Sequence, residues 1–140
     1  MEAKGDVEVD LHHTVEDVGI TLGRALSEAI KEKTGIRRFG FSCIPMDESL
    51  SLFSIDLSGR PYLVFNVQTK GRAGGLGAEV VKEFSKGFSN EARCAVHVNV
   101  LYGENTHHII EAIFKAFGVA LREAVKEEEK RGFPSTEGVL

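Results

Sequence analysis

The chain has 140 residues, 27% of them charged, and a formal net charge of −4, a composition that is typical of a single globular domain. The acidic balance argues against a general nucleic-acid binder, which usually presents a basic face. No apolar run approaches the roughly 20 residues of a membrane helix and no signal peptide opens the chain. We therefore expect one domain over residues 1–140, located in the cytoplasm.

The periodicity of apolar residues predicts the elements of the domain. Residues 70–77, "KGRAGGLG", match no phosphate-binding fingerprint, so we interpret them as a flexible connection. Consecutive strands between helices favour an α+β fold with helices on one face of a mostly antiparallel sheet. In chain order we expect a strand at 7–11, a helix at 12–33, strands at 39–46, 50–57 and 62–68, a helix at about 78–90, a strand at 95–102 and a helix from 106 to about 129.

The two cysteines and His97 have no motif around them that indicates a site. Cys43 and Cys94 form no CxxC or zinc-like spacing, so we predict two small buried hydrophobes in a reducing compartment. His97 alternates with valines in "AVHVNV". We expect it on the polar face of a strand, with no role in a site.

The chain contains an internal repeat. Residues 12–30, "HHTVEDVGITLGRALSEAI", and 107–125, "HHIIEAIFKAFGVALREAV", share eight of nineteen positions at an offset of 95. Each copy follows a predicted strand and carries HHxxE where a long helix begins. The repeat predicts two units, a first over about 4–68 and a second over about 69–140. The second HHxxE follows a helix and a strand, whereas the first has only eleven residues before it. We therefore expect the first unit to be truncated.

Imidazole and carboxylate groups are common ligands of transition metals. On a helix, a histidine and a glutamate three or four residues apart share a face, whereas adjacent histidines point about 100° apart. The motif therefore predicts two metal ions, each taking histidines from both copies. One possible location for these ions is the boundary between two subunits. The alternative interpretation of a His-His pair, a polar helix cap, fits one copy better than two matched copies.

Five segments carry a resemblance to a known family. "DLHHTVEDVGI", "IRRFG", "PMDESLSLFSIDLSGRPYLVF", "NTHHIIEAIFKAF" and "PSTEGVL" together resemble imidazoleglycerol-phosphate dehydratase of histidine biosynthesis, over essentially the whole chain. The resemblance implies tandem βαββ-type units of the ribosomal-protein-S5-domain-2-like fold. It also implies a carbon–oxygen lyase that converts D-erythro-imidazoleglycerol phosphate to imidazole acetol phosphate and water. The resemblance further implies two Mn²⁺ ions per active site, bound between subunits of a trimer-based 24-subunit homo-oligomer. We expect no nucleic-acid or membrane partner.

The resemblance also implies roles for particular residues. Glu16, Glu111 and Lys115 match catalytic positions, and Asp47 matches a recurrent aspartate that is equally a turn residue. The lysine also matches a substrate-binding position, although a plain i, i+4 ion pair is the alternative. Two arginines and a serine match residues that hold the substrate phosphate, a task that suits the arginine fork. The expected metal ligands are His12, His13, Glu16, His107, His108, Glu111 and Glu83, and the expected substrate-binding residues are Arg38, Arg60, Lys115 and Ser135.

The chain departs from the family pattern in two places. Glu137 stands where the family usually has a phosphate-binding lysine, and a negative charge there weakens phosphate binding. The family's leading segment, with its "LDHM"-type motif, is absent before residue 4. Its absence leaves three hypotheses open: a fragment of an active dehydratase, a chain that binds metal but turns over poorly, or a site completed by another chain.

Two other functions remain as alternatives. One is a non-catalytic metal-binding assembly protein that has degenerated through loss of the N-terminal segment. The other is a metal phosphoesterase, because histidine and carboxylate sites also serve hydrolysis.

Overall fold

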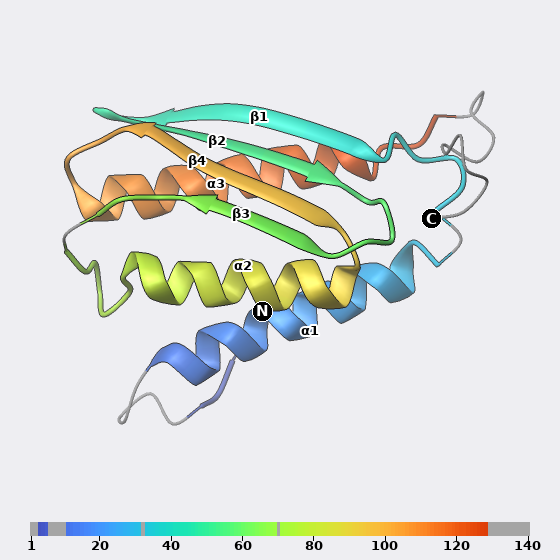
Figure 1. Cartoon of the computed structure of the whole chain (residues 1–140), viewed down its shortest axis with the longest axis horizontal. Helices are drawn as coiled ribbons and strands as arrows, with labels where there is room; N and C mark the ends of the chain where they lie inside the picture. Colours follow the sequence, from blue (N-terminus) through green and yellow to red (C-terminus); the bar gives the residue numbers. More distant parts are fainter. Residues whose placement is uncertain (1–2, 6–10, 32, 70, 129–140) are drawn as a thin grey trace.

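A computed structural model describes residues 3–5, 11–31, 33–69 and 71–128 (Figure 1). Three layers form: a sheet, the two helices α2 and α3 packed on one of its faces, and α1 packed on α2. In chain order the elements are α1 (Leu11–Ala29), β1 (Phe39–Met46), β2 (Ser49–Asp56), β3 (Tyr62–Asn66), α2 (Ala78–Ala92), β4 (Ala95–Tyr102) and α3 (Thr106–Ala124).

The sheet has the strand order β1-β2-β4-β3. The pairs β1–β2 and β2–β4 are antiparallel, whereas β3 lies parallel to β4. Side chains of a strand alternate between the two faces, and in β2 every second residue from Ser49 to Ile55 is buried. The predicted α+β class, with helices on one face of a mostly antiparallel sheet, is confirmed.

The core lies between the sheet and the helices α2 and α3. Phe117 of α3 packs its ring against three others, Phe53 of β2 and Phe84 and Phe88 of α2, at centroid distances of 5.3, 5.9 and 4.9 Å. Tilted and edge-to-face pairs at such distances stabilise a core beyond the area they bury. This cluster fixes α2 and α3 side by side on the sheet, so that both begin at the same end of the molecule (Figure 1).

Helix α1 approaches α2 closely because glycines line the contact. A Cβ atom added at Gly19 would lie 2.4 Å from the carbonyl oxygen of Phe84, and one added at Gly23 would lie 2.7 Å from that of Phe88. Gly87 of α2 faces α1 in turn, beside Ile20. The residue numbers of these contacts increase in the same direction along both helices, so α1 runs parallel to α2 and begins at the same end.

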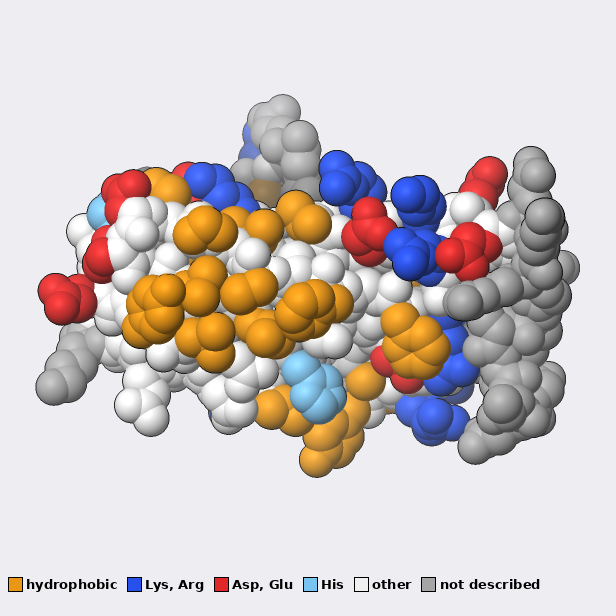
Figure 2. All heavy atoms as spheres, turned by 90° about the horizontal axis from the view of Figure 1, so that it is seen from above, with side chains coloured by type: hydrophobic (Ala, Val, Ile, Leu, Met, Phe, Trp, Pro, Cys, Tyr) orange, Lys and Arg blue, Asp and Glu red, His pale blue; other side chains and the backbone are white. Residues whose placement is uncertain are grey.

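The other face of the sheet is exposed and largely apolar. Phe39, Phe41, Tyr62 and Leu101 are each more than half exposed, and Figure 2 shows hydrophobic side chains gathered across this side of the molecule. His97 shares a shallow groove with the two phenylalanines. The residue is exposed as expected, but the expected polar face is wrong, because its neighbours there include aromatic side chains.

Several sequence-based boundaries need correction. Helix α1 ends at Ala29, four residues before the predicted end, and Lys33 has a left-handed φ of 49° that ends helical geometry. Helix α3 ends at Ala124 rather than near 129, because the following backbone pairs with residues 35–38. Residues 7–10 of the predicted first strand lie outside the described residues, and Leu11 already belongs to α1. Strand β3 ends at Asn66 rather than 68.

The two cysteines differ from each other. Cys94 is completely buried, as predicted, whereas Cys43 is exposed, so the prediction of burial is wrong there. Cys43 lies on the open face of β1, where the period-2 alternation directs it away from the helices. In the part of the chain that the structure describes, no helix is long and apolar enough to cross a membrane.

Candidate functional site

The second HHxxE motif occupies the first two turns of α3. The side chain of Asn105 caps the helix by accepting hydrogen bonds from the backbone N–H groups of His107, at 2.9 Å, and His108, at 3.4 Å. Asparagine is among the favoured residues at this position because it satisfies N–H groups that have no partner in the helix. The cap therefore fixes the backbone from which both imidazole rings project.

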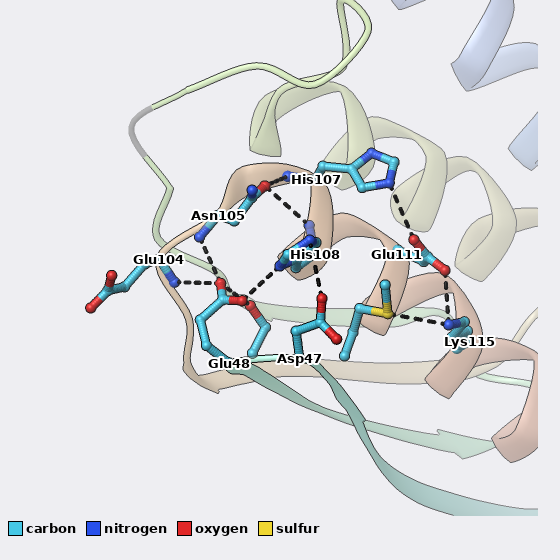
Figure 3. Close-up of polar contacts among 10 residues, drawn as sticks. Asp47, Glu48, Glu104, Asn105, His107, His108, Glu111 and Lys115 are labelled. Atoms are coloured by element: carbon cyan, nitrogen blue, oxygen red, sulfur yellow. Dashed lines mark hydrogen bonds and ion pairs between the residues drawn. The ribbon is translucent and has the colours of Figure 1, made fainter.

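His108 lies between two carboxylates of the β1–β2 turn (Figure 3). Its Nδ1 atom is 2.6 Å from Oε2 of Glu48, and its Nε2 atom is 3.5 Å from Oδ2 of Asp47. The hydrogen bond with Glu48, followed by the charges of both carboxylates, raises the pKa of His108. The turn thus favours the protonated form of the His108 imidazole. A metal ion that binds this ring would have to displace a proton from it.

Glu48 also holds the start of α3. Its Oε1 atom accepts hydrogen bonds from the backbone N–H groups of Asn105, at 2.8 Å, and Glu104, at 3.1 Å, and from the Ser49 hydroxyl at 3.0 Å. The Asn105 amide first, and His108 next, hold the pKa of Glu48 far below its ordinary value. The side chain is therefore ionised across the neutral pH range and acts as a hydrogen-bond acceptor through both oxygens.

His107 projects to a different side of α3, toward Glu111. Its Nε2 atom lies 3.2 Å from one carboxylate oxygen of Glu111, whose other oxygen is 2.8 Å from Nζ of Lys115. Lys115 first, and His107 after it, lower the pKa of Glu111. The rings of His107 and His108 are 6.1 Å apart between centroids and inclined by 67°, so adjacent histidines face different directions, as the helical geometry predicts.

The first motif has the same local geometry on α1. Nε2 of His12 lies 3.9 Å from a carboxylate oxygen of Glu16, and the rings of His12 and His13 are 5.9 Å apart. The two helices, residues 11–29 and 106–124, have bounds that differ by the 95-residue offset of the sequence repeat. The predicted repeat is therefore also a repeat of structure at the level of the helix and its first turn.

The donor atoms suit a transition metal, but one chain does not gather them. Two neighbouring ligands of an octahedral ion lie about 3 Å apart, close to the 3.2 Å between the donors of His107 and Glu111. Among the described residues, however, no group of three or more histidine, cysteine, aspartate or glutamate side chains is arranged to hold an ion. Each motif thus presents one pair of potential ligands, and a complete metal site would need further ligands from elsewhere.

The arginines predicted to hold phosphate lie at the opposite end of the sheet. Arg38 precedes β1, and its guanidinium pairs with Asp56 through Nε–Oδ1 at 2.6 Å and Nη2–Oδ2 at 3.2 Å. Arg60 follows β2 and is itself exposed, although the three residues before it are buried. Strand β2 has eight residues and separates these arginines from the histidine end by roughly 23 Å at about 3.3 Å per residue. A single chain therefore keeps the two parts of the predicted site apart.

The remaining predicted residues are placed as follows. Glu83 lies on α2, partly buried, and one of its carboxylate oxygens is 3.4 Å from Nζ of Lys86 one turn later. Ser135 and Glu137 lie outside the described residues. Lys115 makes the i, i+4 ion pair named as its alternative interpretation, and its Nζ atom also lies 3.3 Å from the sulfur of Met46.

Sequence reasoning missed three side chains that orient the predicted site residues. Asn105, immediately before "THH", carries a local signal because capping residues precede helices. Glu48 carries none, because it lies sixty residues from the histidine that it contacts. Asp56, the partner of Arg38, was likewise invisible, since its contact depends on the register of β1 against β2.

Comparisons with known proteins agree on one family. The family model described as imidazoleglycerol-phosphate dehydratase matches residues 1–121. The chain belongs to this family. A dehydratase of this name from Acetivibrio thermocellus is 53% identical over all of this chain and 73% of its own length. One from Trichlorobacter lovleyi is 51% identical, with the same coverage.

Solved structures of the family share the fold. The crystal structure of IGPD from Pyrococcus furiosus, in complex with (S)-C348, matches with a TM-score of 0.84 and 47% identity, over 92% of this chain and 71% of that one. Imidazoleglycerol-phosphate dehydratase from Staphylococcus aureus matches with a TM-score of 0.82 and 45% identity, over 91% and 72%. The family resemblance found in the sequence is confirmed, and it places the chain among hydro-lyases of histidine biosynthesis.

Proposed function

We propose that the chain is a cytoplasmic, Mn²⁺-dependent imidazoleglycerol-phosphate dehydratase whose active site is shared between subunits of a homo-oligomer. The observation that carries this proposal is the pair of HHxxE motifs, each presenting a histidine–carboxylate pair from the first two turns of a helix. The reaction removes water from D-erythro-imidazoleglycerol phosphate to give imidazole acetol phosphate. Its difficulty is that the C–H bond next to the leaving hydroxyl is not acidic.

The histidines and glutamates of both motifs would hold two Mn²⁺ ions per active site. Bound Mn²⁺ supplies Lewis-acid activation and a template for the imidazole ring of the substrate. Each motif brings one histidine–glutamate pair on one side of its helix and a second histidine on another. The expected ligands are His12, His13, Glu16, His107, His108 and Glu111, with Glu83 as a further candidate.

We assign the movement of protons to Lys115 and the two glutamates. The Lys115 ammonium donates to Glu111 at 2.8 Å and keeps that carboxylate ionised, the form in which it can bind a metal or accept a proton. Lys115 carries protons of its own and would donate one to the eliminated hydroxyl, which then leaves as water. Glu16 occupies the equivalent place in the first motif.

The phosphate would bind at the arginine end of another subunit. Arg60 is exposed, and the bidentate pair with Asp56 orients the Arg38 guanidinium, with Ser135 as a further expected contact. The small substrate cannot span the length of β2 within one chain, so the arginines that serve a given motif have to come from a neighbouring chain. The exposed apolar face of the sheet supports assembly, because large apolar patches mark interaction surfaces.

The proposed activity is tested by dehydration of imidazoleglycerol phosphate after metal removal and after addition of Mn²⁺. We expect no product in the chelated protein and recovery of activity with Mn²⁺. Release of inorganic phosphate instead of imidazole acetol phosphate would identify a phosphoesterase. Mn²⁺ binding without turnover, and without affinity for an imidazole-phosphate ligand, would identify the non-catalytic metal-binding protein.

A further inference from the structure

The contact between the β1–β2 turn and α3 involves more than a helix cap. Glu48 divides its two carboxylate oxygens between two tasks: Oε1 accepts backbone N–H groups of Glu104 and Asn105, and Oε2 faces Nδ1 of His108 at 2.6 Å (Figure 3). A backbone N–H can only donate, so the atom that it contacts has to be an acceptor. The orientation of the Glu48 side chain is thereby fixed before the imidazole is considered.

The fixed carboxylate determines which nitrogen of His108 carries a proton. An ionised carboxylate only accepts hydrogen bonds, so Nδ1 of His108 is the donor in this contact. In a neutral imidazole one nitrogen is protonated and the other has the free lone pair. With the proton held on Nδ1, the lone pair is on Nε2, which points to the side of the ring away from Glu48.

We propose that Glu48 is a positioning residue that holds His108 in the Nδ1–H tautomer and thereby presents Nε2 as a metal ligand. A histidine that binds metal commonly donates its other N–H to a carboxylate, which fixes the tautomer and the orientation of the ring. The role of Glu48 rests on the proposed function, in which His108 binds Mn²⁺. It differs from a structural role, because a cap alone would not depend on the charge of the second oxygen.

The substitution Glu48→Gln separates these two roles. The atom that accepts from the two backbone N–H groups has to remain the amide oxygen, so the amide NH₂ group is directed at Nδ1 of His108. That NH₂ group donates, and Nδ1 becomes the acceptor, so the proton of the neutral ring is transferred to Nε2. Asp47, with Oδ2 3.5 Å from Nε2, favours that transfer. The helix contact is kept while the tautomer is reversed.

The experiment measures the ring nitrogens of the metal-free protein by ¹⁵N NMR, at a pH high enough for His108 to be neutral, and Mn²⁺ affinity by calorimetry. We expect the Nδ1–H tautomer in the wild type and the Nε2–H tautomer in Glu48→Gln, with Mn²⁺ binding weakened about 10- to 100-fold. Glu48→Ala loses both roles, so it should also lower the melting temperature. Glu104→Gln is the matched control, since it removes a neighbouring charge without touching His108, and it should behave like the wild type.

Two results would overturn the role of Glu48. One is an Nε2–H tautomer in the wild-type protein, which is measured without any variant and without metal. The other is Mn²⁺ affinity in Glu48→Gln equal to that of the wild type. Failure of the wild type to bind Mn²⁺ would instead refute the metal part of the proposed function, and the tautomer of His108 would still decide whether Glu48 positions the ring.

Discussion

At the scale of single residues, burial changes the chemistry of Cys94. Cys94 has no exposed surface, and burial raises the pKa of its thiol to about 12 from 9.0. Because the thiolate is the reactive form, Cys94 should resist alkylation in the folded protein and be modified once the protein is unfolded. Peptide mapping by mass spectrometry after brief iodoacetamide treatment should find no label on Cys94 in the native state and a label on it after unfolding. A label on Cys94 in the native state would contradict the buried position.

The same thiol predicts the pH dependence of stability. The pKa of the Cys94 thiol is higher in the folded than in the unfolded state. The neutral thiol therefore contributes fully to the stability of the fold below about pH 9, and this contribution is lost as the pH rises toward about 12. We expect the free energy of unfolding to fall between about pH 9 and 10.5. Denaturant titrations should show a shallower fall in Cys94→Ala than in Cys43→Ala, which serves as the control. If the free energy of unfolding falls equally steeply with pH in both variants, groups other than Cys94 cause the loss of stability at alkaline pH.

At the scale of elements, the repeat produces two similar helices in different surroundings. Gly23 of α1 and Gly118 of α3 are equivalent by the 95-residue offset. A Cβ at Gly23 would meet backbone atoms of α2, whereas a Cβ at Gly118 would meet nothing within 4 Å. The close approach of α1 to α2 therefore depends on the glycine, and the glycine of α3 is replaceable.

This difference predicts opposite effects of one substitution. Gly118→Ala should stabilise by about 0.5–1 kcal/mol, because alanine favours a helix over glycine. Gly23→Ala should destabilise by about 1–3 kcal/mol, because overpacking forces the two helices apart. Chemical denaturation of both variants measures the contrast. A stabilising Gly23→Ala would show that α1 does not pack against α2 as described.

The elements were largely predictable, whereas the contacts between them were not. The alternation of apolar residues located β1 and β4 at their observed bounds, and the HHxxE spacing located the starts of α1 and α3 within a residue. The role of Glu48 and the pairing of Arg38 with Asp56 depend on strand register and on a turn meeting a helix. No local spacing encodes such contacts, so they required the three-dimensional structure.

At the scale of the whole molecule, Mn²⁺ that bridges subunits should control assembly. Chelation removes the shared ion and His108→Ala removes one of its ligands, so either should lower the particle mass measured by light scattering. Arg122→Ala is the control, because this exposed arginine in the last turn of α3 lies away from both motifs and from the apolar face of the sheet, and it should leave the metal-dependent mass unchanged. A particle mass that is the same with and without chelator would argue against ions at the interface.

The separation of the histidine end from the arginine end leads to the central claim, that one active site uses both ends from different chains. Lys115→Met damages the histidine end without removing a metal ligand, and Arg60→Ala damages the other end. Each variant alone should be nearly inactive. Co-expression should restore activity at about a quarter of the sites, because half of the chains contribute an intact histidine end and half an intact arginine end. Mixed assemblies that stay as inactive as the separate variants would contradict a site shared between chains.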